Sequence, residues 1–244
     1  MQGLVSRSLF LLGREAAKIV LPSDCVVCER SLPWDDRIAS CCRGCWDELP
    51  RIEEAKCRRC AYPWDGSAGG EFVCLDCRGR QWSLSWIDSW GHYREALEKT
   101  LFAFKFRRHD FLARPLADLL FQILRDRRDV FFDQVVPIPM HRKKLRLRGY
   151  NQSELLAIPL SRAIGAPVRR RLVKRVDNAT QSRLPKAERS ENVRGVFSVS
   201  GRVQGDRLLL VDDICTTGET LNEAARALLA SGAASVCAIT IARA

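Results

Sequence analysis

The sequence contains no long uninterrupted apolar run. Its N-terminal stretch, MQGLVSRSLFLLGREAAKIVL, carries charged residues at positions 7, 14, 15 and 18, so it falls short of the about 18 consecutive apolar residues that mark a membrane-spanning helix. The stretch also lacks a clear small-residue cleavage site, which argues against a signal peptide. It predicts an amphipathic helix over residues 1–24, of the kind that usually docks on its own protein. We expect a cytoplasmic protein, with peripheral attachment to the inner face of the membrane as the alternative.

Acidic residues are few relative to basic ones. The chain has 29 Asp and Glu against 40 Lys and Arg, a formal net charge of +11 over 244 residues. This excess favours an anionic partner, such as a nucleotide, a nucleic acid or an anionic lipid surface, although solubility alone is the alternative explanation. The glycine motifs GxGxxG and GxxxxGK followed by Ser or Thr are also missing, so dinucleotide binding and nucleotide hydrolysis are poor candidates.

Cysteine, by contrast, is abundant, with 11 residues in the chain. Eight of them form four CxxC pairs, and the second two pairs repeat the first two with a shift of 32 residues at every position, which indicates an internal duplication. A CxxC turn presents two thiolates on one side, and two such turns complete a tetrahedron around zinc. The sequence therefore predicts a double zinc ribbon over residues 25–80 with two structural zinc ions. The predicted ligands are Cys25, Cys28, Cys42 and Cys45 in the first repeat and Cys57, Cys60, Cys74 and Cys77 in the second.

Several further points bear on this zinc prediction. A disulfide framework would need an oxidising compartment, and nothing in the sequence exports the chain. Four cysteines per ion leave no open coordination position, so the metal is structural rather than catalytic. The spacing leaves open whether the pairs combine sequentially or in a cross-braced manner. Cys41 breaks the repeat, and we expect it to be a spare thiol.

From residue 85 onward, apolar strands alternate with amphipathic helices. The expected strands cover residues 85–93, 133–139, 207–211 and 235–242, and the expected helices cover residues 94–106, 111–124, 150–165 and 218–232. This alternation predicts an α/β domain over residues 81–244, with a mainly parallel sheet covered by helices on both faces. Pro159 should kink the third helix. In sheets of this kind, ligands bind at the carboxyl ends of the strands.

The stretch RLLLVDDICTTGETL, residues 207–221, places two carboxylates at one such strand end. Asp212 and Asp213 follow the apolar run directly, and a turn rich in hydroxyl groups then opens a helix. A helix N-terminus offers unpaired N–H donors to a phosphate, and Gly218 lets the backbone approach closely. Carboxylates would repel a phosphate, but they suit the two adjacent hydroxyls of a ribose. The stretch therefore predicts a ribose-5-phosphate site, in which the phosphate contacts Thr216, Thr217, Gly218 and Thr220.

A simpler interpretation of this stretch is a helix cap. Thr216 and Glu219 have the spacing of a capping box, and the two aspartates would then be ordinary turn residues. The whole string is more specific than that, because it closely resembles the phosphoribosyl pyrophosphate (PRPP) signature of type I phosphoribosyltransferases. That signature is an apolar strand, Asp-Asp, then Thr-Thr-Gly and a further Thr. We therefore favour PRPP-type binding over capping alone.

A strongly basic segment follows the strand expected over residues 133–139. Five cations lie between His141 and Gly149: Arg142, Lys143, Lys144, Arg146 and Arg148. A loop this basic at a strand end could neutralise a pyrophosphate, and a solvated run of charge is the alternative. Lys105, which precedes Arg107 and Arg108, and a second cluster over residues 169–175 add to the positive charge.

Taken together, these motifs resemble the ComF family of competence-associated, phosphoribosyltransferase-like proteins. The resemblance covers residues 25–243 and includes the double zinc ribbon. It also includes four stretches in this order: LFAFKFRRHD, VPIPMHRKKLRLRGYNQ, TQSRLPKAERSENVRGVF and LLLVDDICTTGETL. It implies a type I phosphoribosyltransferase fold after the zinc module.

The same resemblance implies roles for individual residues. Asp212 and Asp213 would contact ribose hydroxyls, and the turn that follows them would hold the 5-phosphate. Arg142, Arg146, Arg148 and Lys105 would belong to the ligand site, with the basic loop facing a pyrophosphate accompanied by magnesium. The segment that contains Gln181, Arg189 and Asn192 would close over the site.

Three functional hypotheses remain at this point. The first is a protein that binds PRPP or a related phosphorylated ribose and is linked to DNA uptake in natural transformation. The second is an active phosphoribosyltransferase that acts on an unknown acceptor in nucleotide metabolism. The third is a zinc-ribbon adaptor that binds single-stranded nucleic acid and carries a non-catalytic PRPP-binding domain. Single-stranded DNA and the DNA-uptake machinery are thus candidate partners.

Overall fold

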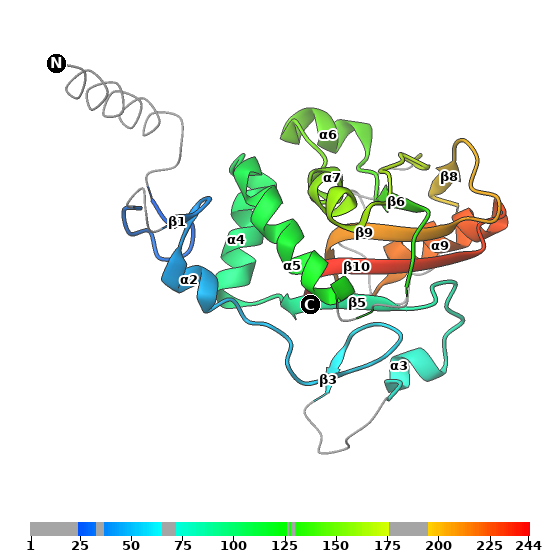
Figure 1. The fold of residues 1–244 in the computed structure, drawn as a ribbon, viewed down its shortest axis with the longest axis horizontal. Coiled ribbons are helices and arrows are strands. Elements are labelled where there is room, and N and C mark those ends of the chain that lie inside the picture. Colours follow the sequence, from blue (N-terminus) through cyan, green and yellow to red (C-terminus); the bar gives the residue numbers. More distant parts are fainter. Residues whose placement is uncertain (1–23, 33–36, 65–71, 126, 128–129, 176–194) are drawn as a thin grey trace.

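The computed structural model describes residues 24–32, 37–64, 72–125, 127, 130–175 and 195–244 (Figure 1). The predicted N-terminal helix and the segment with Gln181, Arg189 and Asn192 lie outside the described residues. Within the described ranges, every helix is too short or too polar to cross a bilayer.

A four-stranded parallel sheet forms the centre of the second half of the chain. Its strand order is β5-β10-β9-β6, and the strands are β5 (Ile87–His92), β6 (Gln134–Pro137), β9 (Arg207–Cys215) and β10 (Ser235–Arg243). The apolar run Leu208–Val211 in β9 is fully buried, as expected for a parallel strand covered on both faces. The predicted fold class, a mainly parallel α/β sheet, is confirmed.

Helices cover both faces of this sheet. One face packs on α4 (Glu95–Phe106), α5 (Ala113–Arg125) and α7 (Gln152–Ile164), and the other packs on α9 (Glu219–Ala230) (Figure 1). The side chains of β9 alternate accordingly, because Leu209 and Val211 join the first core and Leu208 and Leu210 join the second. The helix predicted around Pro159 forms and continues through the proline.

Two elements differ from the sequence-based expectations. The basic segment predicted as a loop is a short helix, α6 (Arg142–Arg148). It forms because the His141 side chain accepts a hydrogen bond from the Lys143 N–H at its start and Gly149 ends it with φ of 86°. In addition, β7 (Leu172–Lys174) pairs antiparallel with β8 (Phe197–Val199). A 3-10 turn, η1 (Asp110–Leu112), precedes α5.

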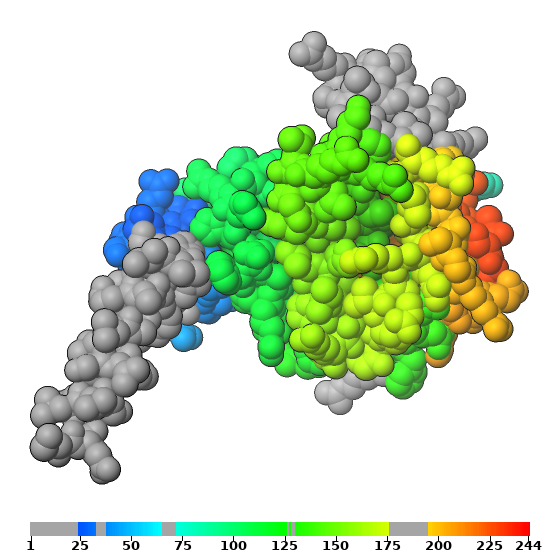
Figure 2. Space-filling model, turned by 90° about the horizontal axis from the view of Figure 1, so that it is seen from above, coloured from blue at the N-terminus to red at the C-terminus, as the bar shows by residue number. Residues whose placement is uncertain are grey.

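The two zinc ribbons dock at different places on this domain. The first contains β1 (Arg37–Ile38), β2 (Cys41–Cys42) and α2 (Arg43–Asp47), and the second contains β3 (Ala55–Lys56), β4 (Pro63–Trp64) and α3 (Leu75–Arg78). Figure 2 shows the first ribbon in blue at one end of the molecule, against the teal surface of α4. The second ribbon lies on the other side of β5 from α4 and α5 (Figure 1).

The chain between the ribbons protects the edge of the sheet. The Ile52 N–H donates to the Trp90 carbonyl at 3.0 Å, and the His92 N–H donates to the Pro50 carbonyl at 2.8 Å. This linker therefore pairs with the edge strand β5, whose backbone groups would otherwise be open to other chains. Gly91 makes the close approach feasible, because a Cβ there would lie 2.6 Å from the Pro50 carbonyl oxygen.

Candidate functional site

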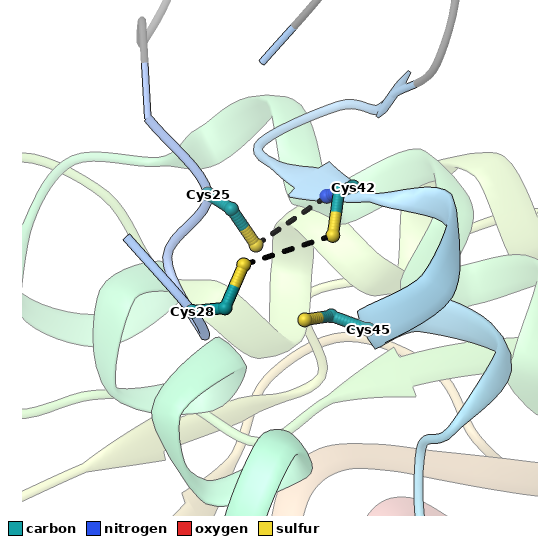
Figure 3. Close-up of side chains that lie close together, drawn as sticks. All are labelled: Cys25, Cys28, Cys42 and Cys45. Carbon is teal, nitrogen blue, oxygen red and sulfur yellow. Dashed lines mark hydrogen bonds between the residues drawn. The ribbon is translucent and has the colours of Figure 1, made fainter. Parts of the chain in front are cut away.

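The eight repeat cysteines gather into two groups of four. Within each group, all sulfur atoms lie within 4.8 Å of one another, and the groups are Cys25, Cys28, Cys42 and Cys45, then Cys57, Cys60, Cys74 and Cys77 (Figure 3 shows the first). The pairs thus combine sequentially, which resolves the choice that the spacing left open.

The sulfur spacing fits zinc. Zinc–thiolate bonds of about 2.3 Å place the sulfurs of a tetrahedron about 3.8 Å apart. The Cys28 and Cys42 sulfurs are 3.8 Å apart, and the Cys60 and Cys74 sulfurs are 3.7 Å apart. The Cys42 N–H donates to the Cys25 sulfur at 3.4 Å, and the Cys74 N–H donates to the Cys57 sulfur at 3.3 Å. Such bonds stabilise the thiolate form that binds metal.

Cys41 lies outside the first tetrad and is a free thiol, as predicted. It is fully buried, and its sulfur lies 3.7 Å from the Thr100 Oγ1 on α4. Cys41 and Leu32 of the first ribbon share one hydrophobic core with α4, α5 and α7. The expectation of a thiol that binds no metal is thus confirmed, and the fold adds a packing role that the repeat pattern does not indicate.

The two aspartates lie at the carboxyl end of β9, as predicted. The Ser153 hydroxyl of α7 donates to the Asp212 Oδ1 at 2.8 Å, and the Asp213 N–H donates to the same oxygen at 2.9 Å. The Lys105 Nζ on α4 lies 3.1 Å from the Asp213 Oδ1. Burial, together with the neighbouring Asp213 charge, raises the pKa of Asp212 to about 7. The structure therefore brings Lys105 to the acidic pair.

Two arginines hold the turn after β9, which we call the threonine turn (Thr216, Thr217 and Gly218). Arg243 donates to the carbonyls of Cys215, at 3.2 Å, and Thr216. Arg80 donates to the Thr217 carbonyl at 3.1 Å. Three consecutive carbonyls, those of Cys215, Thr216 and Thr217, thus accept hydrogen bonds from arginine side chains.

The backbone N–H groups of the threonine turn point the other way. In a trans peptide the N–H lies opposite the preceding carbonyl, and the described chain contains no cis peptide bond. Within the described chain, no protein acceptor meets the N–H of Thr216, Thr217 or Gly218. Consecutive free N–H groups at the start of a helix form an anion-binding concavity. This arrangement can bind a phosphate.

Gly218 fixes how the turn enters α9. It is the N-cap of the helix with φ of 77°, and a Cβ there would lie 2.8 Å from the Trp82 ring. The predicted alternative, a capping box of Thr216 and Glu219, does not form, because Glu219 is ion-paired with Arg80 at 2.6 Å. Thr220 lies in the first turn of α9.

The basic residues of α6 divide into two groups. Arg148 is partly buried and lies over the Phe106 ring at 4.7 Å. Burial lowers the pKa of its guanidinium, and the nearby Asp213 carboxylate partly offsets this. Arg142 and Arg146 are exposed on the same helix. The structure therefore brings Arg148 near the acidic pair and leaves Arg142 and Arg146 at the surface.

Sequence reasoning missed three residues that organise this site. Ser153 lies near the start of the helix predicted over residues 150–165, and no motif in the stretch GYNQSE marks it as a site residue. Arg80 and Arg243 lie 163 positions apart and approach the turn only in the fold. No local spacing marks such long-range contacts.

Comparison with known proteins agrees with this architecture. A phosphoribosyl transferase domain family matches residues 151–244, and a double zinc ribbon domain family matches residues 16–78. Competence protein F of Haemophilus influenzae is 31% identical over 221 residues, which cover 83% of this chain and 96% of that protein. DNA utilization protein YhgH of Salmonella typhimurium is 33% identical over 185 residues, 74% of this chain and 80% of that protein.

A third relative is Competence protein ComFC of Bacillus subtilis, which is 31% identical over 215 residues and aligns with 83% of each chain. The similarity to these proteins covers 74% to 83% of this chain, and the cysteine tetrads and the parallel sheet account for both matched domains. The chain therefore belongs to the ComF family, with a double zinc ribbon followed by a phosphoribosyltransferase-fold domain.

Proposed function

We propose that this protein binds PRPP, or a closely related ribose 5-phosphate, at the carboxyl end of β9. The observation that carries the proposal is the orientation of the threonine turn. Its carbonyls are bound by Arg80 and Arg243, and its N–H groups point away without protein acceptors among the described residues. A 5-phosphate placed against these N–H groups would gain charge-assisted hydrogen bonds.

The acidic pair supports binding of the sugar. Asp212 and Asp213 each make their polar contacts through one carboxylate oxygen, Oδ1, and no described residue donates to either Oδ2. Carboxylate oxygens without a protein donor can accept hydrogen bonds from the 2- and 3-hydroxyls of a ribose. Ser153 and Lys105 hold the carboxylates in place, so little side-chain ordering would be needed on binding.

The cations near the acidic pair would face the pyrophosphate. Lys105 and Arg148 lie closest to the aspartates, and the exposed Arg142 and Arg146 extend the positive surface along α6. Magnesium that accompanied the ligand would offset its negative charge, because this ion binds through substrate phosphates and one or two carboxylates. Asp212 and Asp213 are the carboxylates at this strand end that could contribute.

Isothermal titration calorimetry with PRPP and magnesium tests the proposal. The double variant Asp212→Asn, Asp213→Asn should bind PRPP at least about 100-fold more weakly, because hydrogen bonds to charged groups contribute about 1.5–3 kcal/mol each. Asp118→Asn is the matched control, since Asp118 is an exposed carboxylate on α5. Equal PRPP affinity in the wild type and the double variant would contradict the proposal.

The names of the relatives support a link to DNA uptake, because two of them are competence proteins. We infer that ligand binding at the threonine turn serves this process. In a Haemophilus influenzae strain that lacks its competence protein F, the wild-type chain should restore transformation. The double aspartate variant should restore less than a tenth of that frequency. Full restoration by the variant would separate the ligand site from DNA uptake.

A second candidate function, single-stranded nucleic-acid binding, is favoured by one surface patch. Phe102 and Phe106 are exposed on α4 with ring centroids 5.0 Å apart, and Arg107 and Arg148 lie over their faces. Exposed rings beside cations can stack bases while the charges contact phosphates. Affinity for an oligothymidylate should then fall with salt, with a log-log slope of about −0.7 per neutralised phosphate. Affinity that is independent of salt would contradict this candidate.

A further inference from the structure

A second cavity lies between the second zinc ribbon and the threonine turn. Its volume is about 780 Å³, which is within the range of small-molecule sites. The ribbon, the segment after it and the last strand all contribute walls, through residues that include Tyr62, Trp64, Arg78, Trp82 and Arg243. Neither the zinc sites nor the proposed PRPP site uses these aromatic side chains.

The walls of this cavity are unusually aromatic for an exposed hollow. Tyr62 is 49% exposed and Trp64 is 44% exposed. Aromatic residues are uncommon at such exposed positions, where polar side chains usually stand. Trp64 lies against Phe72 with centroids 5.5 Å apart. Large rings that stay exposed around one hollow mark a binding surface, and their flat faces suit a planar ligand ring. The aromatic walls therefore point to a ligand with a flat ring system.

The charge of the cavity points to an anionic group on the same ligand. Three arginines line it, Arg78, Arg80 and Arg243, against one acidic side chain, Asp76. Arg80 is neutralised by Glu219. Arg243 is occupied, because it donates to the backbone oxygens of Cys60, Cys215 and Ala244 and lies over the Tyr62 ring. Arg78 is exposed and makes no ion pair with a carboxylate among the described residues, and its Nε donates to the Val73 carbonyl at 3.1 Å. The exposed Arg78 guanidinium therefore favours a phosphate at this wall of the cavity.

One buried donor in the wall is also unsatisfied. The Trp82 Nε1–H is inaccessible to solvent and has no acceptor among the described residues. An unmet buried donor costs about 1–3 kcal/mol. This donor is not open to a ligand in the cavity, so the aromatic walls and Arg78 define what fits. A flat ring that carries a phosphate is a nucleotide.

The cavity is separate from the proposed PRPP site. It lies on the side of the threonine turn where Arg80 and Arg243 bind the carbonyls, whereas the free N–H groups point to the opposite side. We propose that this cavity is a second ligand site, for a nucleoside monophosphate, either free or as the end unit of a single strand. Its ring would stack on Tyr62 and Trp64, and its phosphate would contact Arg78.

Calorimetry with AMP on the full zinc-loaded chain tests this proposal. The measurement is made in the Asp212→Asn, Asp213→Asn background, which removes ribose phosphate binding at the other site. AMP should bind this protein, and adding Trp64→Ala should weaken AMP binding about 5- to 160-fold, because a stacked base contributes about 1–3 kcal/mol. Phe131→Ala is the matched control, since Phe131 is an exposed ring in a different groove, and it should leave AMP affinity unchanged.

Further ligands and variants separate the sources of the signal. Adenosine and inorganic phosphate should each bind more weakly than AMP, and Arg78→Gln should reduce the preference for AMP over adenosine. A 5′-phosphorylated oligothymidylate that competes with AMP would identify the strand end as a source, and one that does not compete would identify the free nucleotide. Zinc analysis should find two ions in each variant, which shows that the ribbon remains folded.

Two results would overturn the proposal. One is the absence of AMP binding at millimolar concentration in the double aspartate background. The other is AMP binding that Trp64→Ala and Arg78→Gln both leave unchanged. Neither result affects the test of PRPP binding, because that test measures a different ligand in the wild-type protein.

Discussion

Replacing Gly218 by alanine should destabilise the protein and disable the threonine turn. Gly218 has φ of 77°, and a Cβ there would lie 2.8 Å from the Trp82 Cη2 and 3.1 Å from the Ile87 Cδ1. The left-handed backbone costs a residue with a Cβ about 1–2 kcal/mol, and an overpacked contact costs a further about 1–3 kcal/mol. We therefore expect Gly218→Ala to lower the free energy of unfolding by about 2–5 kcal/mol.

The variant Gly165→Ala is a control that separates the two terms. Gly165 has nearly the same backbone angle, φ of 73°, but a Cβ there would have no heavy atom within 4 Å. It should cost only the backbone term, about 1–2 kcal/mol. Urea unfolding of both variants measures the difference. PRPP titration should show binding lost in Gly218→Ala and retained in Gly165→Ala, because only the first displaces the phosphate-binding N–H groups.

Equal destabilisation by the two substitutions would refute the argument that Trp82 and Ile87 clamp the turn. Normal PRPP affinity in a folded Gly218→Ala protein would show that the turn geometry is not needed for the ligand.

Three further predictions concern the acidic pair, the zinc sites and α6. Because the pKa of Asp212 is raised to about 7, the folded protein keeps a proton that the unfolded chain loses, so the free energy of unfolding should fall as pH rises from about 4 to about 7. Urea unfolding of Asp212→Asn should show a flatter dependence over this window. Cys42→Ser should lower the zinc content from two ions to one, whereas Cys41→Ser should keep two and lower the melting temperature. Arg142→Gln with Arg146→Gln should weaken pyrophosphate binding about 3- to 10-fold, as for two partly screened charges.

Each of these has a contrary outcome. A pH profile that Asp212→Asn leaves unchanged would show that its proton is not linked to folding. Loss of a zinc ion in Cys41→Ser would make that residue a ligand. Unchanged pyrophosphate affinity in the arginine variant, with Arg162→Gln as an exposed control on α7, would remove α6 from the ligand site.

The sequence was most informative where the chemistry is local. Zinc ligands come in CxxC pairs, and the strand, aspartates and turn of the proposed phosphate site are contiguous in sequence. Both patterns can therefore be recognised without knowledge of the fold. Cys41 could not be placed because its partner, Thr100, is distant in sequence. The roles of Arg80, Ser153 and Arg243 at the site were not predicted for the same reason. The segment Arg142–Arg148 is helical because of its caps, His141 and Gly149. The run of cations between them was interpreted as a loop.

The most direct test is a crystal structure of the full chain with PRPP and magnesium. The account predicts the 5-phosphate within hydrogen-bonding distance of the N–H groups of Thr216, Thr217 and Gly218, with the ribose hydroxyls on Asp212 and Asp213. A ligand bound elsewhere, with those N–H groups turned toward acceptors in the protein itself, would contradict it.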